Sequence, residues 1–230
     1  MKITLCLLTW DELEGCKHDI PLIDRTKFDE IYAIDAGSND GTVEYLKKAN
    51  IPAYKQPKKG LNAACKYAVE KCTTDAVIFF HPKGTTPVSD TLKFRKYFET
   101  GYELIIGSRI IKGGVNEEDS KWFRPRKLAV KTFAIIAFLL WRKEGRIIWD
   151  VLHGFRGITI KAFNQINPPD YGLAIDLEMI SRSYKKRIKA IEFPTKESPR
   201  IHGKTHFTAF PTGKKLVISL VNELIRPAGL

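Results

Sequence analysis

The sequence lacks several features that would assign it to a specialised class of protein. Its four cysteines, Cys6, Cys16, Cys65 and Cys72, form no Cys-x-x-Cys pair and have no zinc-type spacing to histidine. We therefore expect reduced thiols and no zinc site. The longest uninterrupted apolar run, residues 133–141, has nine residues, whereas a membrane-spanning helix needs about 20. No internal repeat, low-complexity tract or Pro/Gly/Ser linker divides the chain, which predicts a single globular domain.

Charge of one sign is in excess. The 230 residues include 38 Lys or Arg and 26 Asp or Glu, a formal charge of +12. Residues 121–146 alone contain eight basic residues and one acidic residue. This composition favours anionic partners such as nucleotides, lipid phosphates or acidic bilayers, although a solvated basic face would look the same. Nucleic acid is not expected as a partner, because no recognition-helix or RNA-binding signature is present.

Short apolar segments alternate with helical ones along the chain. Strands are expected at residues 3–9, 31–34, 53–56, 76–80, 104–107 and 188–193. Helices are expected at residues 20–28, 43–48, 61–71, 88–99, 177–185 and 214–225. This alternation predicts an α/β fold with a mostly parallel central sheet and helices on both faces.

The segment 32–42 is the most informative stretch of the sequence. An apolar strand ends in Asp35, and Gly37, Ser38, Asp40 and Gly41 follow before a helix begins. The glycines can adopt positive φ, Ser38 or Asp40 can cap the helix, and the turn presents N–H groups beside a carboxylate. Such a corner suits a nucleotide, although Asp, Gly and Ser are also common in ordinary strand-to-helix turns.

Further polar motifs follow other predicted strands. In chain order the set is Thr9-Trp10-Asp11-Glu12, Asp35 to Thr42, Lys59-Gly60, Gly107-Ser108-Arg109 with Gly113-Gly114, Asp150 to Gly154-Phe155-Arg156, Asp176 with Glu178, and Arg200 with Gly203 and Thr205. In order and spacing this set resembles family 2 glycosyltransferases, and within them the dolichol-phosphate mannosyltransferase and polyprenyl-phosphate sugar transferase branch. The resemblance implies a GT-A fold and transfer of a sugar from a GDP- or UDP-linked donor to a polyprenyl phosphate.

The resemblance also implies roles for individual residues. Thr9 and Asp11 would contact the base and ribose of the donor, Asp35 would hydrogen-bond the base or ribose within the Gly37-Ser38 turn, and Lys59 would lie beside the nucleotide. Arg109 would neutralise phosphate oxygens, and Arg200 would bind the diphosphate or the acceptor phosphate. Arginine suits this role because its planar guanidinium matches pairs of phosphate oxygens.

One departure from the family pattern concerns the metal. After the fourth strand the family normally has Asp-x-Asp, whose carboxylates hold Mg²⁺ or Mn²⁺ on the donor diphosphate, but here the positions are His81 and Lys83. A divalent cation prefers carboxylate oxygens and is repelled by an ammonium group. Three explanations stay open: Lys83, Arg109 and Arg200 stabilise the departing diphosphate without metal; the protein binds nucleotide or lipid phosphate without turnover; or other groups hold the metal.

The chemistry depends on the acceptor. A phosphate monoester is already ionised near neutral pH, so inverting attack on the anomeric carbon requires positioning and charge neutralisation rather than a strong base. A hydroxyl acceptor would require a base, for which Asp176 and Glu178 are the candidates. The same two carboxylates could instead only stabilise the start of a helix.

The basic segment 121–146 is expected to be an insertion on the membrane or acceptor side of a catalytic domain at residues 1–207, followed by a C-terminal amphipathic helix at residues 208–230. Its apolar core and cationic ends suit a membrane interface, and a core helix with basic ends is the alternative. The acceptor and membrane contacts are expected at Arg124, Arg126, Lys127, Trp141 and Lys204. We accordingly expect a cytoplasmic protein, peripheral on the cytosolic membrane face and released by salt.

Overall fold

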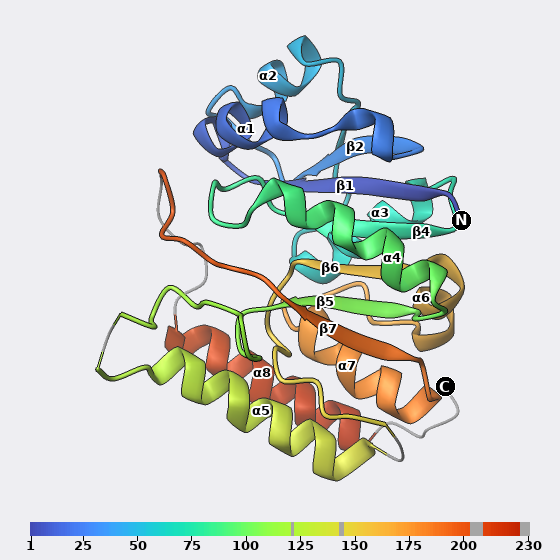
Figure 1. Cartoon of the computed structure of the whole chain (residues 1–230), viewed down its shortest axis with the longest axis vertical. Helices are drawn as coiled ribbons and strands as arrows, with labels where there is room; N and C mark the ends of the chain where they lie inside the picture. The colour runs from blue at the N-terminus through green and yellow to red at the C-terminus, as the bar shows by residue number, and fades with distance from the viewer. Residues whose placement is uncertain (121, 143–144, 203–208, 226–230) are drawn as a thin grey trace.

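The protein is built on one central sheet. The computed structural model describes residues 1–120, 122–142, 145–202 and 209–225, and within them seven strands pair in the order β3-β2-β1-β4-β6-β5-β7 (Figure 1). The strands are β1 Ile3–Thr9, β2 Glu30–Asp35, β3 Ala53–Lys55, β4 Ala76–Phe80, β5 Leu104–Ser108, β6 Arg156–Thr159 and β7 Ala190–Pro194. Only β6 runs antiparallel to its neighbours, β4 and β5. The predicted mostly parallel sheet is therefore confirmed.

Helices cover both faces of this sheet. They are α1 Leu13–Asp19, α2 Thr42–Lys48, α3 Leu61–Lys71, α4 Lys93–Glu99, α5 Pro125–Trp141, α6 Ile160–Ile166, α7 Ile175–Lys186 and α8 Ala209–Ile225. Residues of α1, α2 and α4 share one buried apolar cluster with one face of the sheet, and residues of α3, α6 and α7 share another with the opposite face. The helices α5 and α8 both pack against α7 and run along the edge of the molecule remote from α1 and α2 (Figure 1).

Alternation of side chains along the strands divides the core into these two clusters. In β1, Cys6 and Leu8 belong to the cluster under α3, whereas Leu5 and Leu7 belong to the cluster under α1. Successive strand side chains point to opposite faces. All seven residues of β1 are buried, which explains why the strand appears in the sequence as a continuous apolar run.

The structure differs from the predicted elements in several places. Helix α1 was not predicted, and α8 begins at residue 209, five residues before the expected start. The helix expected at residues 20–28 is replaced by two single 3₁₀ turns, Ile20–Leu22 and Arg25–Lys27. The helix expected at residues 88–99 begins as the 3₁₀ segment Val88–Leu92 before α4. Strand β6 and helix α6 were not predicted. The four residues of β6 include a buried arginine, so the strand gives no apolar pattern in the sequence.

In the part of the chain that the structure describes, no helix combines the length and apolarity needed to cross a membrane.

Candidate active site

The predicted polar residues meet at one edge of the sheet. Parallel strands place their carboxyl ends at the same edge, where open α/β sheets bind ligands. Strands β1, β2, β4, β5 and β7 contribute the segments that follow them, and antiparallel β6 contributes the segment that precedes it. This edge therefore brings together residues from the whole length of the chain.

The turn after β2 is organised by the carboxylate of Asp35. Its Oδ2 accepts hydrogen bonds of 2.8 Å from the backbone N–H groups of Gly37 and Ser38. Its Oδ1 accepts from the hydroxyl of Ser38 at 2.6 Å and from that of Thr9 at 3.0 Å. Gly37 has φ of 98°, a conformation that L residues disfavour. Asp35 thus fixes the shape of the turn and ties it to β1.

A second carboxylate connects the ends of β1 and β2. The N–H of Asp11 donates to the hydroxyl of Ser38 at 2.8 Å, and Asp11 Oδ1 accepts from the N–H of Asn39 at 2.8 Å. Asp11 is exposed and has φ of 51°, which holds its carboxylate at the mouth of the turn. Of the predicted donor residues, Lys59 is exposed in the separate turn before α3.

The His81-Pro82-Lys83-Gly84 turn after β4 is held from below by α1. The buried carboxylate of Asp19 accepts the N–H of Gly84 at 2.9 Å, and burial raises the pKa of this carboxyl. A Cβ on Gly15 would lie 2.1 Å from the carbonyl oxygen of Pro82, so only glycine fits there. The turn that carries Lys83 is therefore rigidly positioned.

Positive charge gathers at this turn. Burial, reinforced by the nearby Arg200, lowers the pKa of Lys83, while Glu12 opposes that shift. Burial and the charge of Lys83 lower the pKa of His81 well below its ordinary value, so the imidazole is neutral near pH 7. Arg200 forms a bidentate pair with the buried carboxylate of Glu12, at 2.7 and 3.2 Å. The N–H of Ser198 donates to the carbonyl oxygen of Thr85 at 2.7 Å, so the segments that carry Lys83 and Arg200 run beside each other.

These residues do not fit a divalent cation. Mg²⁺ and Mn²⁺ require oxygen ligands, chiefly carboxylates. The carboxylate of Glu12 is engaged by Arg200 and that of Asp176 by Arg156 at 3.1 Å, while Lys83 occupies one of the two positions from which a metal ligand is expected. Across the described ranges, no group of three or more His, Cys, Asp or Glu side chains could hold a metal.

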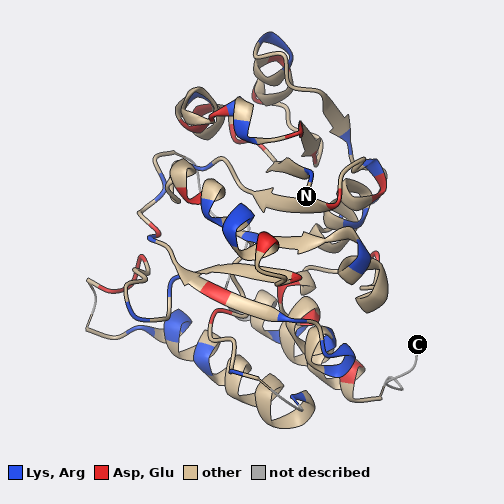
Figure 2. Ribbon diagram, turned by 45° about the vertical axis from the view of Figure 1, so that its right-hand side comes forward, with Lys and Arg blue, Asp and Glu red and all other residues tan. Residues whose placement is uncertain are grey.

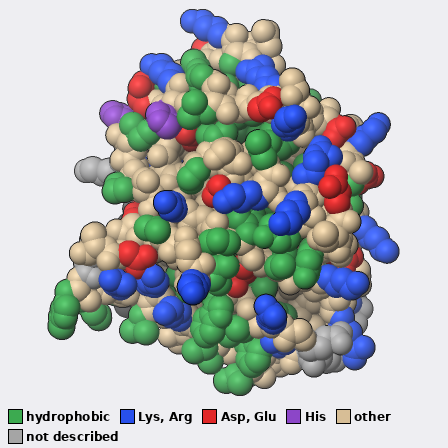
Figure 3. Space-filling view, in the orientation of Figure 1, with side chains coloured by type: hydrophobic (Ala, Val, Ile, Leu, Met, Phe, Trp, Pro, Cys, Tyr) green, Lys and Arg blue, Asp and Glu red, His purple; other side chains and the backbone are tan. Residues whose placement is uncertain are grey.

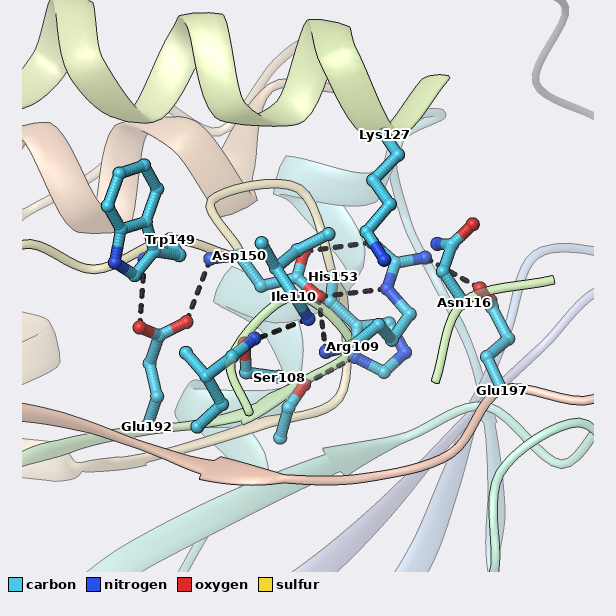
Figure 4. A network of polar contacts seen from close by, with 12 residues as sticks. Ser108, Arg109, Ile110, Asn116, Lys127, Trp149, Asp150, His153, Glu192 and Glu197 are labelled. Atoms are coloured by element: carbon cyan, nitrogen blue, oxygen red, sulfur yellow. Dashed lines mark hydrogen bonds and ion pairs between the residues drawn. The ribbon is translucent and has the colours of Figure 1, made fainter. Parts of the chain in front are cut away.

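Arg109, at the end of β5, lies in a network of ion pairs (Figure 4). Its Nε and Nη2 each donate to a carboxylate oxygen of Asp150 at 2.9 Å, and its Nη1 donates to Glu197 at 2.9 Å. Burial alone would raise the pKa of Asp150, but the guanidinium of Arg109 lowers it to about 2. Glu192 supports the network by accepting the N–H groups of Trp149 and Asp150 at 2.8 Å. The charge of Arg109 is therefore already balanced.

Sequence reasoning gave no role to Arg156, which is only 1% exposed. Its Nε and Nη2 donate to the carbonyl oxygen of His153 at 2.9 and 2.6 Å, and its Nη1 donates to that of Asp176 at 2.7 Å. Burial raises the pKa of the Asp176 carboxyl, and Arg156 opposes this shift. The Gly-Phe-Arg motif was the only signal in the sequence, and it does not show that the arginine turns inward.

Three predicted residues lie outside this arrangement. Glu178 does not join Asp176: its oxygens accept from Asn62 at 2.6 Å and from Ser219 at 2.8 Å, because positions two apart on a helix point in different directions. Trp141 was expected at the membrane, but it is buried at the end of α5 beneath Lys185. Lys204 lies outside the described residues.

The other three predicted acceptor residues are at the start of α5. Arg126 pairs with Glu117 at 2.5 Å, and Arg124 and Lys127 pair with Asp119 at 3.1 and 2.5 Å. Figure 4 shows Lys127 reaching from α5 toward the Arg109 network. Lys127 therefore lies on the side of α5 that faces this network.

The region that forms much of this edge matches a known protein family. The profile of the family described as Glycosyl transferase family 2 matches residues 11–166, more than half of the chain. The chain belongs to glycosyl transferase family 2. The matched region contains the turns after β1, β2, β4 and β5, and the sheet has the GT-A arrangement expected from the resemblance.

Individual relatives of this family 2 chain are distant. It is 27% identical over 204 residues to glycosyltransferase AglJ of Haloferax volcanii, with 86% of this chain and 64% of that protein covered. The chain therefore spans less than two thirds of the length of that relative.

Solved structures share the fold at low identity. Glucosyl-3-phosphoglycerate synthase of Mycobacterium tuberculosis superposes with a TM-score of 0.70 at 14% identity, over 98% of this chain and 81% of that chain. The complex of that enzyme with Mn²⁺, UDP-glucose and phosphoglyceric acid gives a TM-score of 0.69 at 14% identity, over 98% of this chain and 80% of that chain.

Proposed function

We propose that this protein transfers a sugar from a GDP- or UDP-linked donor to a polyprenyl (dolichyl) phosphate at the cytosolic face of a membrane. The observation that carries the proposal is the pair of cations formed by Lys83, which follows β4, and Arg200, which follows β7. In this proposal the pair replaces the metal that the family normally holds there. Family membership and the nucleotide-sugar complex of a structural relative support the choice of donor.

The donor base and ribose would bind at the turn after β2. The hydrogen bonds of Asp35 pre-shape this turn, so little conformational entropy is lost when a ligand binds. Asp11 contributes an exposed carboxylate that can accept hydrogen bonds from a base or from ribose hydroxyls. Thr9 supports the arrangement through its bond to Asp35.

The reaction would be an inverting displacement. An oxygen of the acceptor phosphate forms a bond to the anomeric carbon, while the bond from that carbon to the donor diphosphate breaks on the opposite side. The nucleoside diphosphate leaves with the bonding electron pair, and Lys83 and Arg200 neutralise the charge that develops on it. Binding of the diphosphate would draw Arg200 away from Glu12.

For a hydroxyl acceptor, Asp176 would be the general base. Its raised pKa favours proton acceptance near neutral pH, and Arg156 holds its backbone and carboxylate in place. The carboxylate of Glu178 is already hydrogen-bonded to Asn62 and Ser219. Of the two carboxylates that the sequence offered as a base, Asp176 is therefore the candidate that remains.

The first test is equilibrium binding of GDP-mannose, UDP-glucose and UDP-N-acetylglucosamine by calorimetry, each with Mn²⁺ and with EDTA. We expect one donor to bind equally in both conditions. Binding that requires Mn²⁺ would contradict the role given to the cation pair.

A non-catalytic protein that binds nucleotide or lipid phosphate on the same scaffold is the second candidate. The observation that favours it is that Arg109 and Arg200 are each already paired with carboxylates. Turnover with any donor and a short-chain polyprenyl phosphate excludes this candidate, whereas donor binding without turnover for all three donors would support it.

A further inference from the structure

The helices α5 and α8 have apolar side chains on two opposite faces. In α5, Val130, Ala134 and Ala137 form a buried stripe. Leu128 and Leu139, which are 60% and 72% exposed, lie on the opposite side. A helix on the surface of a soluble domain normally turns a polar face outward.

The helix α8 repeats this pattern. Leu216 and Leu220 are buried, whereas Val221 and Ile225 are 47% and 75% exposed. Figure 3 shows apolar side chains gathered over the lower part of the molecule, where α5 lies, with Lys and Arg beside them. We call the outward-facing residues of both helices the outer surface, and its apolar members are Leu128, Ile135, Leu139, Leu140, Val217, Ile218, Val221, Leu224 and Ile225.

The charged residues of the outer surface are basic. Lys131 of α5 and Lys214 and Lys215 of α8 are exposed. Figure 2 shows the Lys and Arg residues of α5 in its first half. Residues 125–141 contain no Asp or Glu, and Glu223 of α8 is buried against Arg182 and Lys185.

A groove of about 390 Å³ adjoins the basic part of the outer surface, and it is lined by Trp122, Phe123, Arg124, Lys127, Leu128 and Lys131. Trp122 is fully exposed. Aromatic rings beside cations are typical of the boundary between acyl chains and headgroups.

We propose that the outer surface of α5 and α8 docks on a bilayer that contains anionic phospholipid. The exposed Leu, Ile and Val side chains enter the acyl boundary, and the lysines lie at the level of the phosphates. A second copy of the chain is the less complementary occupant, because the outer surface has no exposed acidic side chain among its described residues to meet the lysines. The inference does not depend on turnover.

Vesicle flotation with the full chain tests the proposal. Wild-type protein is incubated with phosphatidylcholine vesicles or with vesicles containing phosphatidylglycerol, at low and high salt. We expect binding to the anionic vesicles that high salt weakens without abolishing, because screening acts on the lysines and not on apolar contact.

Paired variants identify the surface. We expect L139E/V221E to lower partitioning into anionic vesicles at least about tenfold, while the control L22E/L92E, in exposed leucines elsewhere, does not. K214E/K215E should lower it at low salt, whereas K47E/K48E on α2 should not. Circular dichroism and donor binding of each variant verify that the fold and the donor site are intact.

Three outcomes would overturn the proposal. They are no binding of the wild type to either vesicle, equal binding of L139E/V221E and wild type, and a dimer in analytical ultracentrifugation that L139E/V221E dissociates. The last outcome would assign the outer surface to a second copy. Donor binding retained in any of these cases would leave the proposed donor site unaffected, so failure of the membrane surface and failure of the donor site are distinguished.

Discussion

The two halves of the site edge are held together by different interactions. At the ends of β1 and β2, Asp35 and Asp11 accept hydrogen bonds from N–H and hydroxyl groups nearby. At the ends of β4, β5 and β7, buried or half-buried charges neutralise one another, as in the pair of Arg109 with Asp150. Arg200, after β7, pairs in the same way with Glu12 from the end of β1. In the first half, carboxylates are held by uncharged hydrogen-bond donors, whereas in the second half carboxylates are held by arginines. In the proposed function, the second half is where the phosphates would bind.

The strongest test of the second half removes one charge from its centre. Asp150→Asn removes the buried carboxylate that accepts from both Nε and Nη2 of Arg109 and leaves Glu197 as its anionic partner. Breaking a buried ion pair by removing one partner costs about 3–5 kcal/mol. We expect the free energy of unfolding, measured in urea, to fall by that amount. The control Asp119→Asn, in a more exposed cluster, should cost less than about 1 kcal/mol. Equal losses would contradict the distinction between the two clusters.

The next test addresses chemistry. In Lys83→Ala we expect kcat for sugar transfer to polyprenyl phosphate to fall about 100-fold, equivalent to about 3 kcal/mol, because a preorganised positive charge is lost from the leaving group. Lys83→Arg should retain much of the activity. Transfer of radiolabelled sugar measures both variants, and undiminished kcat in Lys83→Ala would show that the diphosphate is stabilised elsewhere.

The two halves should also differ in their response to pH. Burial and Arg109 lower the pKa of His153 to about 3, from 6.5 in the unfolded chain, so the unfolded state binds more protons between these values and stability falls as pH falls. At about 1.4 kcal/mol per pH unit, His153 should remove roughly 2 kcal/mol between pH 7 and pH 5. His153→Asn keeps a donor for the carbonyl of Gly107, and chemical unfolding at both pH values should show a smaller difference. An unchanged difference would mean that His153 is not the responsible group.

The smallest effect is expected in the first half. Asp35→Asn keeps one carbonyl acceptor but cannot accept from both N–H groups of the turn and the two hydroxyls, so we expect a loss of about 1–2 kcal/mol. Urea unfolding measures it, with Asn39→Ala as the exposed control. A loss of unfolding free energy as large as that of Asp150→Asn would contradict the difference between the two halves.

The difference between the two halves also explains which parts of the candidate site the sequence could predict. The turn after β2 depends on neighbours within three residues of Asp35 and on Thr9 of the adjacent strand, so its pattern is visible in the sequence. The pair of Arg200 with Glu12 joins positions 188 apart, and no local pattern reports it. Arg109 was expected to contact phosphates. Its guanidinium instead donates hydrogen bonds to Asp150 and Glu197, and this arrangement depends on how β5 and β7 pair.

The same reasoning applies to the fold. Strands β1 and β4 have the predicted ends because both are buried along their whole length and are therefore largely apolar. Strand β6 was missed because Arg156 and Gly157 interrupt the apolar pattern. Trp141 and Glu178 were placed from residue type alone, whereas the packing of α5 and α8 on α7 decides where they point.

The antiparallel direction of β6 has a consequence for how such proteins diversify. Ile106 of β5 pairs with Arg156 of β6, so the chain leaves the sheet and returns to it at adjacent positions. The ion pair of Arg109 with Asp150 closes the stem of that excursion. The loops on either side of α5 can therefore change in length while the sheet register is preserved, whereas α5 itself must keep the side chains that it buries in the core. A designer of chimeric proteins could exchange these loops while keeping α5 packed against α7.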